Sequence, residues 1–75
     1  MGRAGKALKQ VLESYGISQN QLAVAMKIDR SNVSRWVKET MDPSSEAVYE
    51  IKKALDAIDP EASERFVMLY LYEAD

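Results

Sequence analysis

The sequence has no cysteine and no histidine among its 75 residues. The missing thiols exclude disulfide bridges and thiolate metal sites, which often stabilise domains of this size. The missing imidazoles remove the most frequent general base and the commonest metal-binding side chain. The sequence also shows no glycine-rich phosphate loop, and the carboxylates of Glu46 and Glu50 are interpreted as plain surface charges. We therefore expect no catalytic residue, no metal site and no cofactor.

Long hydrophobic runs are missing as well. No apolar stretch approaches the roughly 18 residues that span a membrane, and the first residues lack the apolar core of a secretory signal. The length fits a single small domain over residues 1–75 with a modest core. The sequence thus predicts a cytoplasmic domain without membrane contact, which is stabilised by close helix packing or by a partner subunit.

Basic and acidic residues are separated along the chain, although the net charge is only −2. Residues 1–38 hold seven basic and two acidic side chains, which gives a net charge of +5. Residues 39–75 hold three basic and ten acidic side chains, which gives a net charge of −7. Such a division predicts one basic working surface and one acidic, solvated surface. The alternative is that the charges divide by chance.

Apolar residues recur at steps of three and four along the chain, which predicts helices throughout. Residues that commonly cap a helix precede four of these apolar stripes: Ser18, Asp29, Ser44 or Ser45, and Asp59. Gly16 marks the end of the first helix, and Pro43 breaks the chain before the fourth. The segment "FVMLYLY" could also form a strand, but the capped "DPEASE" before it favours a helix over about residues 60–72. The fold class is therefore all-α, with five helices.

The third predicted helix carries a polar arc. At about 100° per residue, five polar side chains share an arc of about 140°, with no acid among them: Arg30, Ser31, Ser34, Arg35 and Lys38. Val33, Trp36 and Val37 lie on the opposite side, toward the core. An α-helix fits the major groove of DNA, where arginine can bind guanine with two hydrogen bonds. The alternative is an ordinary amphipathic helix with a solvated polar face.

The stretch "GISQNQLAVAMKIDRSNVSRWVKE" resembles the helix-turn-helix unit of the lambda-repressor-like, Cro-type regulators, called the XRE family. The family pattern begins G-L/I-S-Q and ends E-x-G, and these residues match it: Gly16, Ile17, Ser18, Gln19, Leu22, Ala23, Ile28, Ser31, Val33, Ser34 and Trp36. The segment "DPSSEAVYEIKKAL" is similar to the fourth helix of the family. The resemblance covers roughly residues 4–58. It implies a five-helix lambda-repressor-like DNA-binding domain, with a helix-turn-helix core at about residues 17–39.

The resemblance also implies which residues contact DNA. Gln19 matches a glutamine that usually holds a phosphate, at a helix N-terminus, which favours anions. The candidate DNA-binding residues are Gln19, Arg30, Ser31, Asn32, Ser34, Arg35 and Lys38. Further candidates for phosphate contacts are Lys6, Lys9 and Thr40. Asn32 lies at the edge of the polar arc, so it either holds a phosphate or supports the helix cap.

Two departures from the family pattern carry structural expectations. Lys27 stands where a glycine commonly fills the turn, so it has a positive φ unless the turn has adjusted. Leu12 and Val37 stand where the family often has an arginine and a glutamate. An apolar pair in place of a buried ion pair is often neutral or stabilising, and we expect Leu12 and Val37 to touch.

The last predicted helix is apolar on all sides. Ala62, Phe66 and Leu69 form one stripe, and other apolar side chains lie opposite or between. A helix of this kind is buried all round or shared with a partner, and the resemblance implies dimerisation C-terminal to the helix-turn-helix. We therefore expect a homodimer, with these interface residues: Val67, Leu71, Met68 and Tyr72. The alternative is that the helix packs within its own chain and leaves apolar surface exposed.

These observations predict a prokaryotic or phage-type transcriptional regulator. It would bind double-stranded DNA sequence-specifically, read the major groove with the helix at about residues 30–39, and need no small-molecule ligand. The alternative on the same fold is an antitoxin-like or adaptor module, in which the acidic half and the C-terminal helix bind an unknown protein partner. A purely structural helical bundle would leave the acid-free polar arc unexplained.

Overall fold

The structure, a computed structural model, describes residues 3–73, and this part of the chain contains helices and no strand. The elements are α1 (Arg3–Tyr15), α2 (Gln19–Met26), α3 (Arg30–Val37), α4 (Ser45–Ile58), α5 (Pro60–Met68) and the π-helical turn η1 (Leu69–Glu73). The five-helix, all-α prediction is confirmed. The segment at 66–72 is helical, but its last turn is wound as a π-helix rather than an α-helix.

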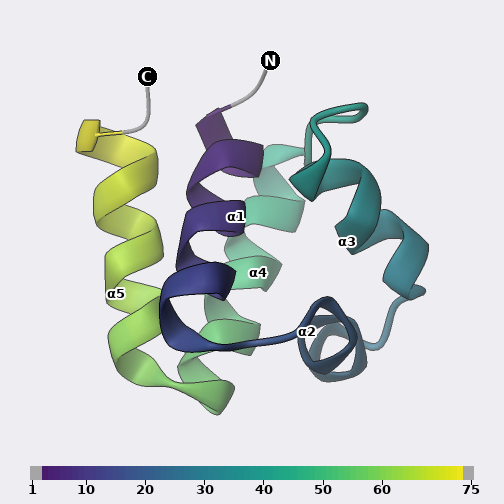
Figure 1. The fold of residues 1–75 in the computed structure, drawn as a ribbon, viewed down its shortest axis with the longest axis horizontal. Helices are drawn as coiled ribbons and strands as arrows, with labels where there is room; N and C mark the ends of the chain where they lie inside the picture. The colour runs from purple at the N-terminus through teal and green to yellow at the C-terminus, as the bar shows by residue number, and fades with distance from the viewer. Residues whose placement is uncertain (1–2, 74–75) are drawn as a thin grey trace.

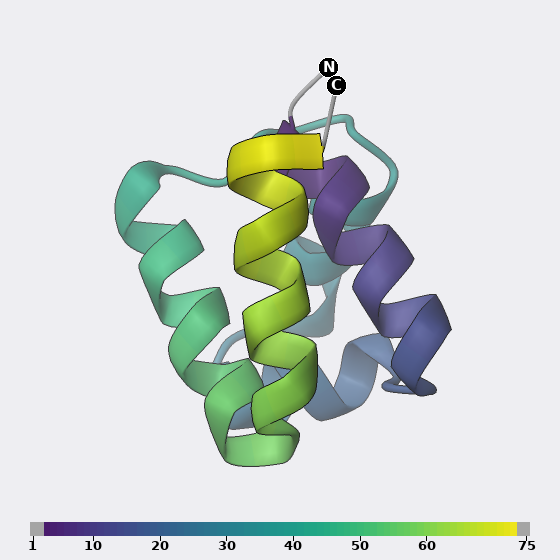
Figure 2. The same cartoon turned by 90° about the vertical axis from the view of Figure 1, so that its left-hand side faces the viewer.

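The helices enclose one core, with α5 and α3 on opposite sides of it (Figure 1). α1 and α4 lie between these two helices, and α2 is seen end-on below α3. α5 packs against both α1 and α4, as Figure 2 shows from the side, while α3 packs against α1 and α2. The helix-turn-helix formed by α2 and α3 therefore lies on the side of the molecule away from α5.

Every α-helix contributes buried apolar side chains to the core. The large side chains that are fully buried are Leu8, Val11, Leu22, Val33, Ile51, Leu55 and Phe66. The apolar side predicted for the third helix is buried at Val33 and Trp36, whereas Val37 at its end is half-buried. Trp36 is buried too, and among the described residues its indole Nε1 has no hydrogen-bond partner.

The predicted caps begin the helices. At the start of α2, the Gln21 N–H donates to Ser18 Oγ (3.0 Å) and the Ser18 N–H donates to Gln21 Oε1 (2.9 Å), which completes a capping box. Ser44, rather than Ser45, caps α4. Asp59 caps α5 by accepting the Glu61 N–H at 3.0 Å. Short-range chemistry thus determines where these helices start.

Left-handed residues end the first three helices. Gly16, Lys27 and Glu39 have φ angles of 64°, 61° and 62°. In each case the next residue's N–H donates back to a carbonyl five residues earlier, which is the Schellman pattern. The positive φ expected for Lys27 is confirmed, so the turn keeps the shape that a glycine would give it. The same conformation at Glu39 was not expected from the sequence.

Gly5 allows α1 and α3 to approach closely. Gly5 is buried in α1, and a Cβ atom added there would overlap with the carbonyl oxygen of Trp36 at the end of α3. The added Cβ atom would also lie 3.3 Å from the Cγ of Glu39. Because the nearest atom belongs to the backbone of α3, which cannot rotate away as a side chain can, a larger residue at position 5 would force the two helices apart.

We expect Gly5→Ala to lower the free energy of unfolding by roughly 1–3 kcal/mol, the usual cost of overpacking. In an open helix the same change would raise that free energy by about 1 kcal/mol, because alanine is the better helix former. Urea unfolding followed by circular dichroism gives the sign directly. A stabilised Gly5→Ala variant would contradict the close approach of α1 and α3.

Candidate nucleic-acid interface

The turn between α2 and α3 fixes the angle at which α3 is presented. The Lys27 N–H donates to Val24 O (3.1 Å), and the Ile28 N–H donates to Ala23 O (3.0 Å). Ile28 is half-buried against the core. Asp29 then caps α3 by accepting the Ser31 N–H at 3.0 Å. The turn is therefore held by backbone hydrogen bonds on one side and by an apolar anchor on the other.

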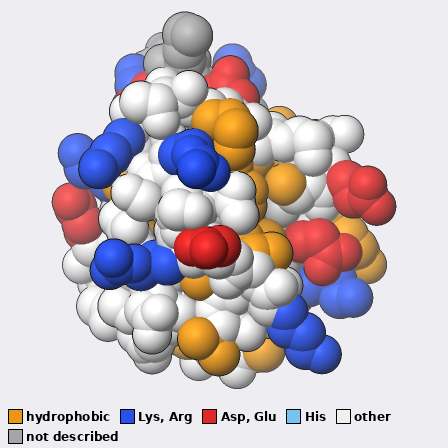
Figure 3. All heavy atoms as spheres, turned by 90° about the vertical axis from the view of Figure 1, so that its right-hand side faces the viewer, with side chains coloured by type: hydrophobic (Ala, Val, Ile, Leu, Met, Phe, Trp, Pro, Cys, Tyr) orange, Lys and Arg blue, Asp and Glu red, His pale blue; other side chains and the backbone are white. Residues whose placement is uncertain are grey.

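The polar arc of α3 faces solvent. Arg30, Ser31, Arg35 and Lys38 are exposed and Ser34 is half-buried. The opposite side of α3 is buried against α1 and the core. Figure 3 looks onto this side of the molecule, where lysine and arginine side chains predominate on the left and others lie at the lower right. Acidic side chains predominate on the right, although some lie among the basic ones.

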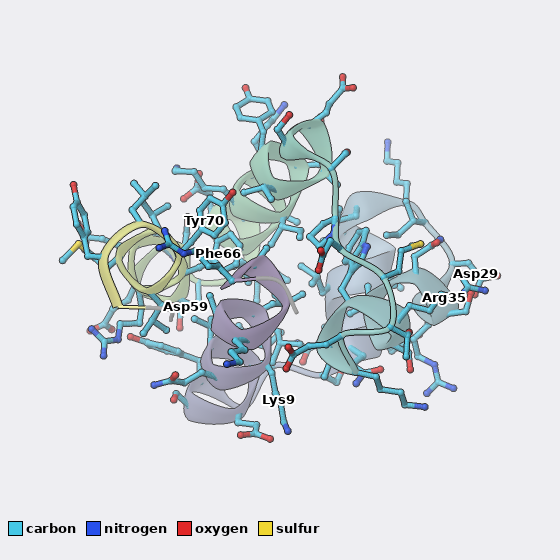
Figure 4. All side chains as sticks on the ribbon, turned by 90° about the horizontal axis from the view of Figure 1, so that it is seen from above. Lys9, Asp29, Arg35, Asp59, Phe66 and Tyr70 are labelled. Atoms are coloured by element: carbon cyan, nitrogen blue, oxygen red, sulfur yellow. The ribbon has the colours of Figure 1, made fainter. Side chains whose placement is uncertain are left out.

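Two polar side chains near the start of α3 interact with Arg35. Arg35 Nη1 donates to Asn32 Oδ1 at 3.3 Å. Asp29 and Arg35 lie together at the outer edge of α3 (Figure 4), and the charge of Arg35 acts on Asp29. The pKa of Asp29 is lowered, first by the Ser31 N–H and more weakly by the charges of Arg35 and Arg30. The carboxylate is therefore ionised at neutral pH, and it belongs to the polar surface.

The start of α2 meets the second half of α1 at a shallow surface pocket. Six residues line this pocket: Lys9, Leu12, Glu13, Ile17, Gln19 and Val37. Lys9 and Gln19, which are ten residues apart in the sequence, are thereby brought to one place. Leu12 and Val37 line the same pocket, so they lie near each other, and their direct contact stays a prediction. Glu13 also lines this pocket.

The remaining phosphate candidates lie just after the C-terminal end of α3 and in the first half of α1. Lys38 is exposed at the C-terminal end of α3. Thr40 is exposed as well, and its Oγ1 donates to Arg35 O at 3.3 Å. Lys6 is exposed on α1, one residue after Gly5, where α1 approaches the end of α3. The candidates from α1, α2 and α3 thus belong to neighbouring elements.

The four dimer candidates lie on α5 and η1, away from α3 (Figure 1). Val67 is half-buried, whereas Met68, Leu71 and Tyr72 expose 42%, 52% and 74% of their surface. Together they line a groove that α4 and α5 border with Lys52, Asp56, Glu61 and Glu64, among others. As expected, the opposite stripe of Ala62, Phe66 and Leu69 is buried. The chain therefore leaves an apolar strip of α5 and η1 uncovered.

Two negative observations hold for the part of the chain that the structure describes. None of its helices is long and apolar enough to cross a membrane. Within residues 3–73, no group of three or more acidic side chains is arranged to hold a metal ion.

Comparison with known proteins agrees with this geometry. A family model described as helix-turn-helix matches residues 8–62, from α1 through the first turn of α5. No curated protein and no solved structure matches the chain. The matched residues make up more than half of the chain and include the complete unit formed by α2, the turn and α3. The chain therefore belongs to the XRE-type, lambda-repressor-like family of DNA-binding helix-turn-helix proteins.

Proposed function

We propose that the protein binds duplex DNA sequence-specifically and regulates transcription, with α3 in the major groove. One observation carries this proposal: the solvent-facing side of α3 has Arg30, Ser31, Arg35 and Lys38, with no acid, in a helix-turn-helix of a DNA-binding family. Base contacts in such units concentrate at the start of the second helix. Arg30 and Ser31 are the first residues of α3. The side chain of Arg35 is held toward the same end of the helix by its hydrogen bond to Asn32.

The phosphate contacts of the proposed complex come from the elements around α3. Gln19 begins α2, whose N-terminal dipole favours an anion. Lys9 lies at the same pocket and adds a positive charge. In the proposed complex, neighbouring phosphates of the DNA backbone are contacted by Lys38, Thr40 and Lys6. These contacts fix the orientation of α3 on the duplex, whereas the base contacts supply the sequence preference.

The proposed DNA complex contains two copies of the chain. A two-fold dimer places two copies of α3 about 34 Å apart, in successive major grooves on one side of the duplex. The uncovered strip of Val67, Met68, Leu71 and Tyr72 is the apolar surface that the two copies share. Because the strip lies on α5 and η1 rather than on α3, dimerisation leaves both copies of α3 exposed.

Selection of bound sequences from a random duplex pool tests this function. We expect an enriched site with two-fold symmetry, and an affinity that falls steeply with salt because lysines and arginines displace counterions. For about four neutralised phosphates, the slope of log affinity against log salt is near −4. Lys38→Ala should weaken binding to all sequences alike and flatten this slope by about 1. A salt-independent affinity, or no binding at low salt, would contradict the proposal.

A second candidate function is an antitoxin-like or adaptor role. The observation that favours it is the apolar strip itself, which the acids Glu61 and Glu64 border on α5. A surface of this composition can receive a different protein instead of a second copy. Copurification from cells, followed by mass measurement, separates the two functions. A stable complex with another protein, together with no affinity for DNA, would favour the adaptor.

A further inference from the structure

We propose that Asn32 is a positioning residue, which holds the guanidinium of Arg35 in the orientation in which Arg35 reads a base pair. This inference rests on the proposed function, since it concerns how α3 recognises DNA. Asn32 was expected from the sequence either to hold a phosphate or to support the helix cap. The geometry points to a third role, in which Asn32 acts on DNA through another side chain.

The contact follows from the spacing of the two residues on α3. Asn32 and Arg35 are three residues apart, so their side chains lie on one face of the helix. Helical side chains lean toward the N-terminus, which brings the guanidinium of Arg35 back over Asn32. Arg35 Nη1 lies 3.3 Å from Asn32 Oδ1 and donates to it. The free protein therefore already holds Arg35 toward the start of α3.

The side chain of Asn32 has less conformational freedom than a fully exposed side chain would have. It is half-buried, and it lines a pocket between α3 and α4 together with Trp36 and Ile28. Its backbone N–H donates to Asp29 O at 3.0 Å, within the first turn of the helix. The side chain of Asn32 is thus enclosed on one side, while Arg35 remains exposed on the other.

The negative charge of Asp29 also favours this orientation of the Arg35 side chain. The Asp29 carboxylate caps α3 and attracts the guanidinium of Arg35 toward the same end of the helix. Asn32 takes only one of the five N–H donors of the guanidinium, which leaves enough donors for the two hydrogen bonds that guanine accepts in the major groove. A neutral carboxamide also adds no negative charge near the phosphates. Arginine ordered in this way loses less conformational freedom on binding.

A double-mutant cycle tests the role of Asn32. The four proteins are the parent, Asn32→Ala, Arg35→Ala and the double variant, each titrated with the preferred duplex and with duplexes that change one base pair. We expect Asn32→Ala to lower discrimination at the base pair read by Arg35 by about three- to tenfold, the usual effect of losing one solvent-exposed hydrogen bond. In the Arg35→Ala background, Asn32→Ala should change nothing further.

Two controls separate positioning from a structural effect. Alanine is the better helix former, so Asn32→Ala should not unfold α3, and circular dichroism checks this. The salt slope should stay unchanged, because Asn32 neutralises no phosphate in this proposal. Asn32→Gln keeps the carboxamide oxygen and should restore most of the lost discrimination.

Each outcome of the cycle decides the question. If Asn32→Ala lowers binding equally with and without Arg35, Asn32 contacts DNA itself; the positioning role is then overturned, while the proposed function stands. The role is also overturned if Asn32→Ala leaves discrimination intact, or if Arg35→Ala does not change the base preference. Failure of the proposed function looks different, because none of the four proteins would then prefer any duplex.

Discussion

Replacing both Arg30 and Arg35 by alanine should abolish most of the preference of the protein for its selected DNA site. Each arginine that binds guanine with two hydrogen bonds contributes about 1–3 kcal/mol of discrimination, or roughly five- to 150-fold. Both side chains are exposed on the polar arc of α3. The double variant should retain weak, salt-sensitive binding to any duplex, because Lys6 and Lys9 of α1 and Lys38 just after α3 remain.

Competition between the selected duplex and a scrambled one of equal length measures this effect. Arg65→Ala is a matched control, since it removes an exposed arginine from α5, on the side of the molecule away from α3. It should leave the preference unchanged. If the Arg30/Arg35 variant discriminates as well as the parent, then α3 is not the recognition helix and the proposed function must be revised.

The second large effect is a difference between substitutions on the buried stripe and on the uncovered strip of α5 and η1. We expect Leu69→Ala to lower the free energy of unfolding by roughly 2–5 kcal/mol, as the loss of a core leucine does. Leu69 is only 3% exposed, and it continues the buried stripe of Ala62 and Phe66. Val67→Glu combined with Leu71→Lys should instead give a folded monomer, because these side chains lie on the uncovered strip.

Sedimentation and urea unfolding separate these two expectations. The double variant should keep helical circular dichroism and should sediment as a single chain of 8.5 kDa, whereas Leu69→Ala should unfold at a lower urea concentration. If the parent is itself monomeric at high concentration, the strip is not an interface between copies. A different protein would then be its partner, as the adaptor hypothesis requires.

The helix boundaries could be predicted from the sequence because capping is local. Ser18, Asp29 and Asp59 each accept an N–H two or three residues away, so a short stretch of sequence contains the whole interaction. The turn at Lys27 could be predicted because the family pattern has glycine there. The same pattern ends in a glycine where this chain has Glu39, so the second left-handed residue also stands at a glycine position of the family.

Other features depend on tertiary structure and could not be predicted. Gly5 looks like any helical glycine in the sequence, and only the crossing of α1 over the end of α3 shows why a side chain is excluded. The role of Asn32 depends on side-chain conformation, which periodicity does not describe. The π-helical turn at Leu69–Glu73 has the same apolar composition as an α-helical one.

Trp36 gives this protein a built-in optical probe. It is the only tryptophan in the chain, and its buried indole lies on the side of α3 opposite the polar arc, where its own carbonyl meets Gly5. An indole shielded from water emits at shorter wavelength than a solvated one. Its fluorescence therefore reports whether α3 is docked on α1, without any label on the polar arc. A loosened α3 can thus be distinguished from a lower affinity for DNA in the same fluorescence titration.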